Sequence, residues 1–167
     1  MPVMSTETDR KDRFDKLART YSTDLYRYAI WLCGNEALAK DLVQETFLRA
    51  WRALDSLKSE GAAKSWLITI LRREYARTFE RKVPQFTDVD SVVVPDDDEL
   101  EPDERTERDL LRKGMASLAP KYREPLMLQV VMGYSCAEIA EQLDISKSAV
   151  MTQLFRAREQ LKTKLRK

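Results

Sequence analysis

The side chains whose types and spacing could do chemistry in this sequence are mostly cations, gathered in two stretches. Between Ser146 and Lys167 there are seven basic residues and one acid, and a second group of arginines around Tyr75 follows Trp66. Clustered lysine and arginine attract phosphates, and an aromatic ring among them can stack on an unpaired base. The pattern favours nucleic-acid binding, although each stretch taken alone is also compatible with a solvated helix face.

The sequence lacks the residue patterns that catalysis or metal binding would need. The chain has no histidine, and Cys33 and Cys136 are far apart and outside any metal-ligand spacing, so a zinc site is nearly excluded. There is no glycine-rich phosphate loop and no nucleophile motif. We therefore expect no enzyme, no cofactor and no metal. The chain also lacks a long apolar run and a signal peptide, and we expect a cytoplasmic protein with reduced thiols.

The net charge of +1 hides a segregation of charge along the chain. Residues 88–104 carry nine acids and no base, whereas basic residues are in excess on both sides. A segment so acidic and so poor in core-forming residues cannot fold alone and is typical of a flexible linker. With 167 residues, of which 43% are hydrophobic, the chain can form two small domains around this linker.

The C-terminal part predicts a helix-turn-helix. Cys136, Ile139 and Leu143 share the face of a short helix, and Asp144 can adopt the left-handed conformation that ends it. Ser146 can cap a second helix, in which Val150 and Leu154 face inward. A basic second helix after a tight turn is the arrangement that many DNA-binding proteins place in the major groove.

The N-terminal part predicts a long helix that ends at Gly34 and a second helix capped by Asn35. The second helix has an apolar stripe, and its opposite arc carries Asp41, Gln44, Glu45, Leu48 and Arg52. An exposed leucine among hydrogen-bonding groups is typical of a protein-binding face. A solvated face with one stray leucine is equally compatible with the periodicity.

A loop over Asp55–Lys64 precedes a third helix. We expect Trp66, Leu67, Ile70, Leu71, Thr78 and Phe79 inside that helix, and Arg72, Arg73, Tyr75, Arg77, Arg81 and Lys82 outside. Two further helices are expected at about Glu107–Leu118 and Pro120–Met132. The predicted fold is all-α, with a disordered N-terminus (1–9), a helical-bundle domain (10–84), the acidic linker (85–106) and a helix-turn-helix domain (107–167).

Three motifs in this order resemble the extracytoplasmic-function (ECF) sigma factors of the bacterial sigma-70 family. Asp41–Phe47 (DLVQETF) followed by Trp51 resembles the polymerase-binding helix of region 2.2, and Trp66–Arg73 resembles the start of region 2.4. The segments Leu118–Leu128, Gly133–Ala140 and Val150–Arg158 resemble region 4. The resemblance covers about residues 10–165.

The resemblance implies a transcription initiation factor that binds core RNA polymerase and promoter DNA, opens the −10 region and is subject to an anti-sigma factor, in a cell-envelope or environmental stress response. It implies polymerase binding by Asp41, Gln44, Glu45 and Leu48. It implies −10 contacts from Ser59, Glu60, Lys64, Arg72, Arg73, Tyr75, Arg77 and Arg81. It implies −35 contacts from Lys147, Ser148, Met151, Thr152, Phe155 and Arg156.

The sequence departs from the family pattern at Arg73 and Arg77, where the family often has Asn and Asp. It departs again at Met151 and Gln153, where Lys and Arg are common, so the promoter sequence stays open. Two other classes of function also stay open. A free-standing repressor or activator would bind duplex DNA as a homodimer, and an anti-sigma or adaptor protein would leave both basic faces unused. Co-elution with core polymerase separates the first of these from a sigma factor.

Overall fold

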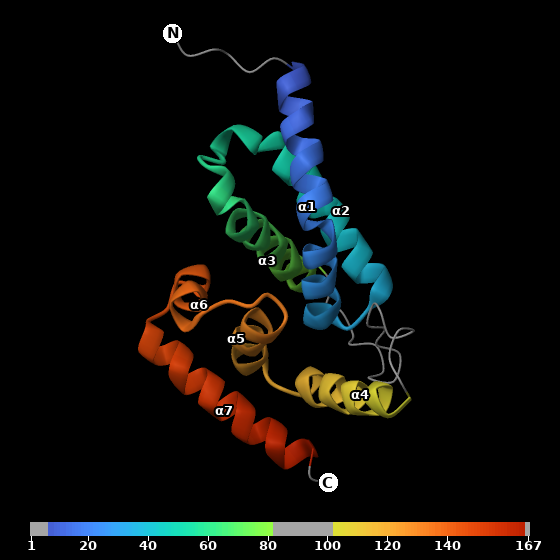
Figure 1. Ribbon diagram of the computed structural model, residues 1–167, viewed down its shortest axis with the longest axis vertical. Coiled ribbons are helices and arrows are strands. Elements are labelled where there is room, and N and C mark those ends of the chain that lie inside the picture. The colour runs from blue at the N-terminus through green and yellow to red at the C-terminus, as the bar shows by residue number, and fades with distance from the viewer. Residues whose placement is uncertain (1–6, 82–101, 166–167) are drawn as a thin grey trace. The chain divides into compact units, whose positions relative to one another are not determined.

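The computed structural model describes residues 7–81 and 102–165, and every element among them is helical (Figure 1). The first stretch contains α1 (Glu7–Cys33), α2 (Glu36–Arg52), the 3₁₀ turns η1 (Leu54–Ser56) and η2 (Glu60–Ala62), and α3 (Ala63–Arg81). The second contains α4 (Pro102–Ala116), α5 (Pro120–Val130), α6 (Cys136–Leu143) and α7 (Lys147–Leu165). The predicted all-α class is confirmed.

Contacts group the chain into two compact units. The first unit comprises Met1–Tyr26 and Lys40–Pro84, and the second comprises Arg27–Ala39 and Gln85–Lys167. The first unit therefore contains α3 with most of α1 and α2. The second contains α4 to α7 together with the end of α1, the start of α2 and the turn that joins them. None of the helices in the described residues is both long and apolar enough to cross a membrane.

Local capping chemistry fixes the helix ends that the sequence predicts. Gly34 follows α1 with a φ of 68°, a left-handed conformation that glycine adopts without steric cost. The Asn35 side-chain oxygen accepts a hydrogen bond from the Leu38 amide at 3.0 Å. This bond satisfies one of the unpaired donors at the start of α2.

The helix-turn-helix is closed by a cap at each helix start. The Ser135 hydroxyl accepts from the Glu138 amide at 3.1 Å, and the Glu138 carboxylate accepts from the Ser135 amide at 3.0 Å, which is a reciprocal capping box. Asp144 ends α6 with a φ of 56°. Ser146 then accepts from the Ala149 amide at 3.0 Å and starts α7, so both predicted turn positions are confirmed.

Each unit has its own apolar core. In the first unit, Leu17, Leu54, Leu57 and Ala63 form a buried cluster against which Phe14, Tyr21 and Trp66 pack. The Phe14 ring also meets the rings of Phe47 and Trp51 edge-on, at centroid distances of 6.0 and 5.4 Å. The second unit buries Met115, Leu118, Leu126, Met127, Leu128, Ile139, Val150, Leu154 and Ala157.

Several predicted boundaries are wrong. Residues 7–9 are helical, because α1 begins at Glu7, and residues 102–106 form the start of α4, where Pro102 and two acids suit a helix N-terminus. Helix α5 starts at Pro120, as expected, and ends at Val130, two residues before the predicted end at Met132. The rest of the predicted linker, residues 85–101, and Lys82 lie outside the described residues, as do residues 1–6.

The inner face of α3 also differs from the prediction. The helix begins at Ala63, so Lys64 is helical, and Trp66 and Ile70 are only half-buried. Ile68 is fully buried, and the charged residue Glu74 is buried as well, being only 6% exposed. Periodicity alone could not find Glu74, since its burial depends on a partner from α2.

Candidate nucleic-acid and partner interfaces

The outward face of α2 exposes the side chains that the sequence predicts for a protein partner. Asp41 and Gln44 are exposed, Leu48 is 49% exposed, and Glu45 is half-buried. The Glu45 carboxylate lies 3.4 Å from the Arg49 guanidinium, one helical turn later. The structure therefore brings the four predicted residues together on one helix face, with an apolar side chain among polar ones.

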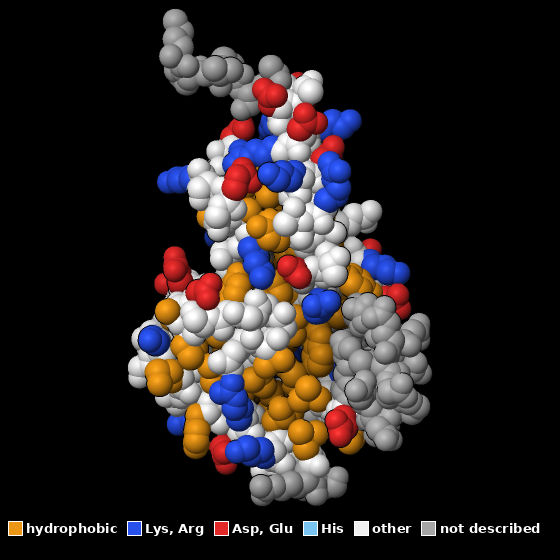
Figure 2. Space-filling model, viewed as in Figure 1, with side chains coloured by type: hydrophobic (Ala, Val, Ile, Leu, Met, Phe, Trp, Pro, Cys, Tyr) orange, Lys and Arg blue, Asp and Glu red, His pale blue; other side chains and the backbone are white. Residues whose placement is uncertain are grey.

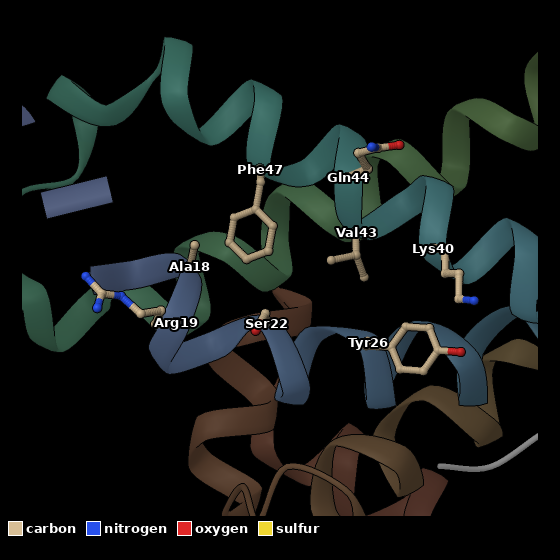
Figure 3. Close-up of a pocket in the computed structure, with 8 residues that line it drawn as sticks. All are labelled: Ala18, Arg19, Ser22, Tyr26, Lys40, Val43, Gln44 and Phe47. Atoms are coloured by element: carbon tan, nitrogen blue, oxygen red, sulfur yellow. The ribbon is translucent and has the colours of Figure 1, made fainter. Parts of the chain in front are cut away.

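An apolar groove lies beside this face, between α1 and α2. It encloses about 690 Å³, and its lining residues are Ala18, Arg19, Ser22, Tyr26, Lys40, Val43, Gln44 and Phe47. In Figure 3, Val43 and Phe47 reach from α2 toward α1, and the cations Arg19 and Lys40 lie toward opposite ends. Gln44 lines the groove and also belongs to the predicted partner face, so the two surfaces are continuous.

The segment between α2 and α3 is held in shape by one arginine from α1. Arg13 donates to the Leu57 carbonyl at 2.9 Å, to the Leu54 carbonyl at 3.5 Å and to the Glu60 carboxylate at 2.7 Å. These acceptors belong to η1, η2 and the residues between them. We call residues 54–62 the hinge loop, and Ser59 and Glu60 are its exposed predicted DNA contacts.

A second arginine of α1 binds the start of the same loop. Arg10 donates to the Trp51 carbonyl at 2.6 Å and lies 3.7 Å from the Asp55 carboxylate. Its guanidinium also stacks over the Trp51 ring, 4.7 Å from the centroid. The hinge loop and the end of α2 are thus held by long-range contacts from α1, and neither arginine was predicted from the sequence.

The outer side of α3 carries the other predicted −10 residues. Arg73 is exposed, while Arg72, Tyr75, Arg77 and Lys64 are half-buried, and α3 ends at Arg81, whose side chain lies outside the described part. Buried Glu74 forms ion pairs with Arg49 and with Arg77, the second at 3.6 Å. Arg77 therefore has a structural partner in addition to its predicted role.

The outer face of α7 presents all six predicted −35 residues to solvent: Lys147, Ser148, Met151, Thr152, Phe155 and Arg156. Val150, Leu154 and Ala157 of the same helix are buried. Hydrophobic and basic side chains lie next to one another along α7 on the face that Figure 2 shows. The exposed face is therefore mixed in chemistry.

Helix α5 orients two arginines of α7. Arg156 hydrogen-bonds the Tyr122 hydroxyl, and this bond lowers the pKa of Tyr122 below its ordinary value. Lys121 lies over the Tyr122 ring at 5.0 Å from its centroid, and Arg158 donates to the Gln129 side chain. Lys121 and Tyr122 extend the basic surface onto α5, and neither residue was predicted from the sequence.

The two cysteines are free thiols. Cys33 is buried, and burial raises the pKa of its thiol to about 11, so the reactive thiolate is scarce at neutral pH. Within residues 7–81 and 102–165, no three histidine, cysteine or acidic residues are close enough together to hold a metal ion.

Two family models match the chain in order. The model for sigma-70 region 2 matches residues 17–83, and the model for sigma-70 region 4 matches residues 108–161. The ECF RNA polymerase sigma factor SigL of Mycobacterium tuberculosis is 33% identical over 141 residues, which are 80% of this chain and 77% of that protein. The chain belongs to the ECF RNA polymerase sigma factors.

Other relatives of this ECF sigma factor differ in length. RNA polymerase sigma factor YlaC of Bacillus subtilis is 29% identical over 94% of both chains. SigE of Mycolicibacterium smegmatis is 29% identical over 92% of this chain, which spans only 62% of that protein.

Among solved structures, RpoE of Bartonella quintana, in complex with the anti-sigma factor NepR, has a TM-score of 0.74 at 24% identity, covering 92% of this chain and 97% of that one. CnrH, in complex with the cytosolic domain of CnrY, has a TM-score of 0.68 at 24% identity, covering 92% and 87% of the two chains. Both support the fold.

Proposed function

We propose that this ECF sigma factor binds core RNA polymerase, directs it to promoters and helps to open the −10 region. One observation carries the proposal. The chain has both the α2 face that exposes Leu48 and the α7 face that exposes basic, hydroxyl and apolar side chains, and these faces lie in the matches to sigma-70 region 2 and region 4, respectively. Helices α1 to α3 serve the polymerase and the −10 element, helices α4 to α7 serve the −35 element, and residues 82–101 stand between them in the chain.

The −10 element is handled by the hinge loop and the outer side of α3. Extruding a base from the stack costs a few kcal/mol, and only a pocket of fixed shape can offset that cost. The hydrogen bonds from Arg13 to the Leu54 and Leu57 carbonyls hold the backbone of the loop in place, and Arg10 binds the end of α2 at the Trp51 carbonyl. Arg72, Arg73 and Arg77 then lie on the following helix, where they can bind phosphates of the separated strands.

The −35 element is read by α7 in the major groove. Lys147 and Arg156 bind phosphates or base edges, and Ser148 and Thr152 supply hydroxyls. We place the protein in the cytoplasm, in a cell-envelope or environmental stress response, acting as an initiation factor without catalysis of its own. An anti-sigma factor is a further proposed partner, supported by the complex of RpoE with NepR.

The test is reconstitution with core polymerase and run-off transcription on a promoter library. We expect co-elution with core polymerase and transcripts from a restricted set of promoters. A protein that binds duplex DNA alone as a homodimer and never co-elutes would contradict the proposal.

The Leu48→Asp variant tests the partner face itself. A charge at the centre of an apolar contact should weaken polymerase binding about tenfold or more, while the fold should persist because Leu48 is half exposed. Thr20→Asp adds the same charge at an exposed position of α1 and serves as the matched control. Equal competition of Leu48→Asp and parent for core polymerase would show that this face is only solvated surface.

A further inference from the structure

The exposed face of α7 consists of two parallel rows of side chains. Residues four apart on a helix are neighbours on one side, so Ser148, Thr152 and Arg156 form a polar row. Lys147, Met151 and Phe155 form a second row, whose last two members are apolar. Met151 is 57% exposed and Phe155 is 66% exposed, which makes them the most exposed large apolar side chains of this helix.

The two rows can do different chemistry in a major groove. Hydroxyls and a guanidinium can hydrogen-bond to base edges, and Thr152 already orients its hydroxyl by donating to the Ser148 carbonyl at 3.1 Å. Met151 and Phe155 have no group that could read a hydrogen-bond pattern. The apolar feature that base edges present in the major groove is the C5-methyl group of thymine.

We propose that Met151 and Phe155 are specificity-determining residues that read thymine methyl groups in the −35 element. This inference rests on the proposed function and adds the chemical class of base that the apolar row selects. Contact with a methyl group removes apolar surface of both partners from water, so thymine is preferred over cytosine at the positions that the row faces.

The spacing of the apolar row fits this role. Four residues of an α-helix rise roughly 6 Å, which is about two base-pair steps of a helix that lies along the groove. The orientation of the row is fixed, because Val150 and Leu154 are buried on the other side of α7 and Ser146 caps its start. Met151 and Phe155 therefore cannot turn into the core without unfolding the helix.

The surroundings of the row complement DNA in charge. Lys147 precedes it on the same side of α7, Arg156 follows Phe155, and Lys121 of α5 lies at the Tyr122 ring beside Arg156. An apolar row flanked by cations suits a polyanion that carries methyl groups. It suits an apolar protein surface less well, because such a surface would leave these cations unpaired.

The experiment uses the holoenzyme reconstituted with core polymerase. The preferred −35 duplex is first selected from a library, and each of its thymines is then replaced in turn by deoxyuridine. Deoxyuridine keeps every hydrogen-bonding group and lacks only the methyl. We expect at least one replacement to weaken binding about fourfold, as the loss of one buried methyl group implies.

Variants of the row identify the reader of each methyl group. We call the loss of affinity on replacing a thymine by deoxyuridine the uracil effect. Met151→Ser and Phe155→Ser should each abolish the uracil effect at one position, and Met151→Leu should retain it. Gln160→Ser alters another exposed residue of α7 and should leave every uracil effect unchanged. Because both target side chains are exposed, circular dichroism should show an unchanged helix content.

The possible outcomes separate this inference from the proposed function. Two outcomes would overturn the inference alone. In the first, the holoenzyme prefers a −35 sequence without thymine; in the second, it binds its preferred −35 sequence equally well after every replacement of thymine by deoxyuridine. Uracil effects that survive in both serine variants also overturn it, and Thr152 would then be the methyl reader. A holoenzyme without any −35 preference overturns the proposed function and the inference together.

Discussion

At the scale of single residues, Arg13 shapes the surface proposed for the −10 element. Its guanidinium spans two carbonyls and one carboxylate, a task that needs several donors in a fixed planar arrangement. Lysine has one compact ammonium group and cannot reach all three acceptors. The exposed Glu60 carboxylate is held by this contact, which links η2 to α1.

We predict that Arg13→Lys will alter −10 selectivity almost as much as Arg13→Ala, because charge alone does not restore the planar contact. Either variant should lower the free energy of unfolding by about 1–3 kcal/mol, chiefly because the Leu57 carbonyl loses the donor that Arg13 supplies at 2.9 Å. Urea denaturation and transcription from −10 variants measure the two effects. Glu60→Gln is the control for stability, since an exposed ion pair contributes less than about 1 kcal/mol. Parental selectivity in the Arg13→Lys protein would show that charge suffices.

A second prediction concerns the tyrosine that orients Arg156. The hydrogen bond from Arg156 favours the tyrosinate and holds the pKa of Tyr122 below its ordinary value. Arg156→Gln should therefore raise the pKa of Tyr122, which an NMR titration of the ring carbon can follow from about pH 8 to 11. Arg158→Gln is the control, because Arg158 is held by Gln129. A pKa that is the same in both variants would exclude the contact.

At the scale of elements, Gly114 lets α4 approach α7 closely. A Cβ atom at Gly114 would lie 2.6 Å from a methyl carbon of Leu161, whereas a Cβ atom at Gly61 would meet nothing within 4 Å. Glycine inside a helix costs about 1 kcal/mol relative to alanine. The close approach offsets that cost because it brings the last turns of α7 against α4. There, Lys164 donates a hydrogen bond to the Ser117 carbonyl at 3.2 Å.

We predict that Gly114→Val will destabilise the second unit by about 1 kcal/mol, since the added side chain must displace the half-buried Leu161 side chain from its contact with α4. Gly61→Val is the matched control and should change stability little. Chemical denaturation followed by circular dichroism measures both. If the two variants unfold at the same denaturant concentration, the close packing of α4 on α7 does not limit stability.

The same scale explains what the sequence could predict. Helix ends at Gly34, Asn35, Asp144 and Ser146 follow from contacts within four or five residues, and such contacts can be read from residue types. The exposed rows of α2 and α7 follow from the helical period. Burial of Glu74 and the reach of Arg13 depend on partners 25 and 47 positions away in the chain, and no periodic pattern encodes them. Geometry around the proposed −10 surface was therefore the part that the sequence did not reveal.

At the scale of the whole molecule, the distribution of charge matters more than the net charge of +1. The cations proposed for DNA lie on α3, α5 and α7, whereas residues 88–104 hold nine acids and no base. Because the acids and the cations belong to one chain, we expect this acidic segment to compete with DNA phosphates for the same cations. Competition of this kind is screened over roughly 10 Å at 0.1 M salt.

We predict that neutralising Asp96, Asp97, Asp98 and Glu99 will raise the affinity of the free protein for promoter DNA several-fold at low salt and change it little at high salt. The control carries the same charge change elsewhere, at Glu7, Asp12, Asp15 and Asp24 of α1. Fluorescence anisotropy over a salt series measures both. An equal gain in DNA affinity in the two proteins would show that only the net charge matters. No gain in DNA affinity would show that the acidic segment does not mask the cations.

The contacts from Arg10 and Arg13 limit how promoter preference can be exchanged between family members. They bind a segment that lies 41 to 47 positions later in the chain. If the hinge loop of another family member replaced residues 54–62 alone, it would lack the α1 side chains that hold its own shape. A chimeric protein with the donor's promoter preference therefore needs the donor's first turns of α1 as well. During evolution, changes at residue 60 should accordingly be accompanied by changes at residue 13, and new promoter preferences should arise through paired substitutions.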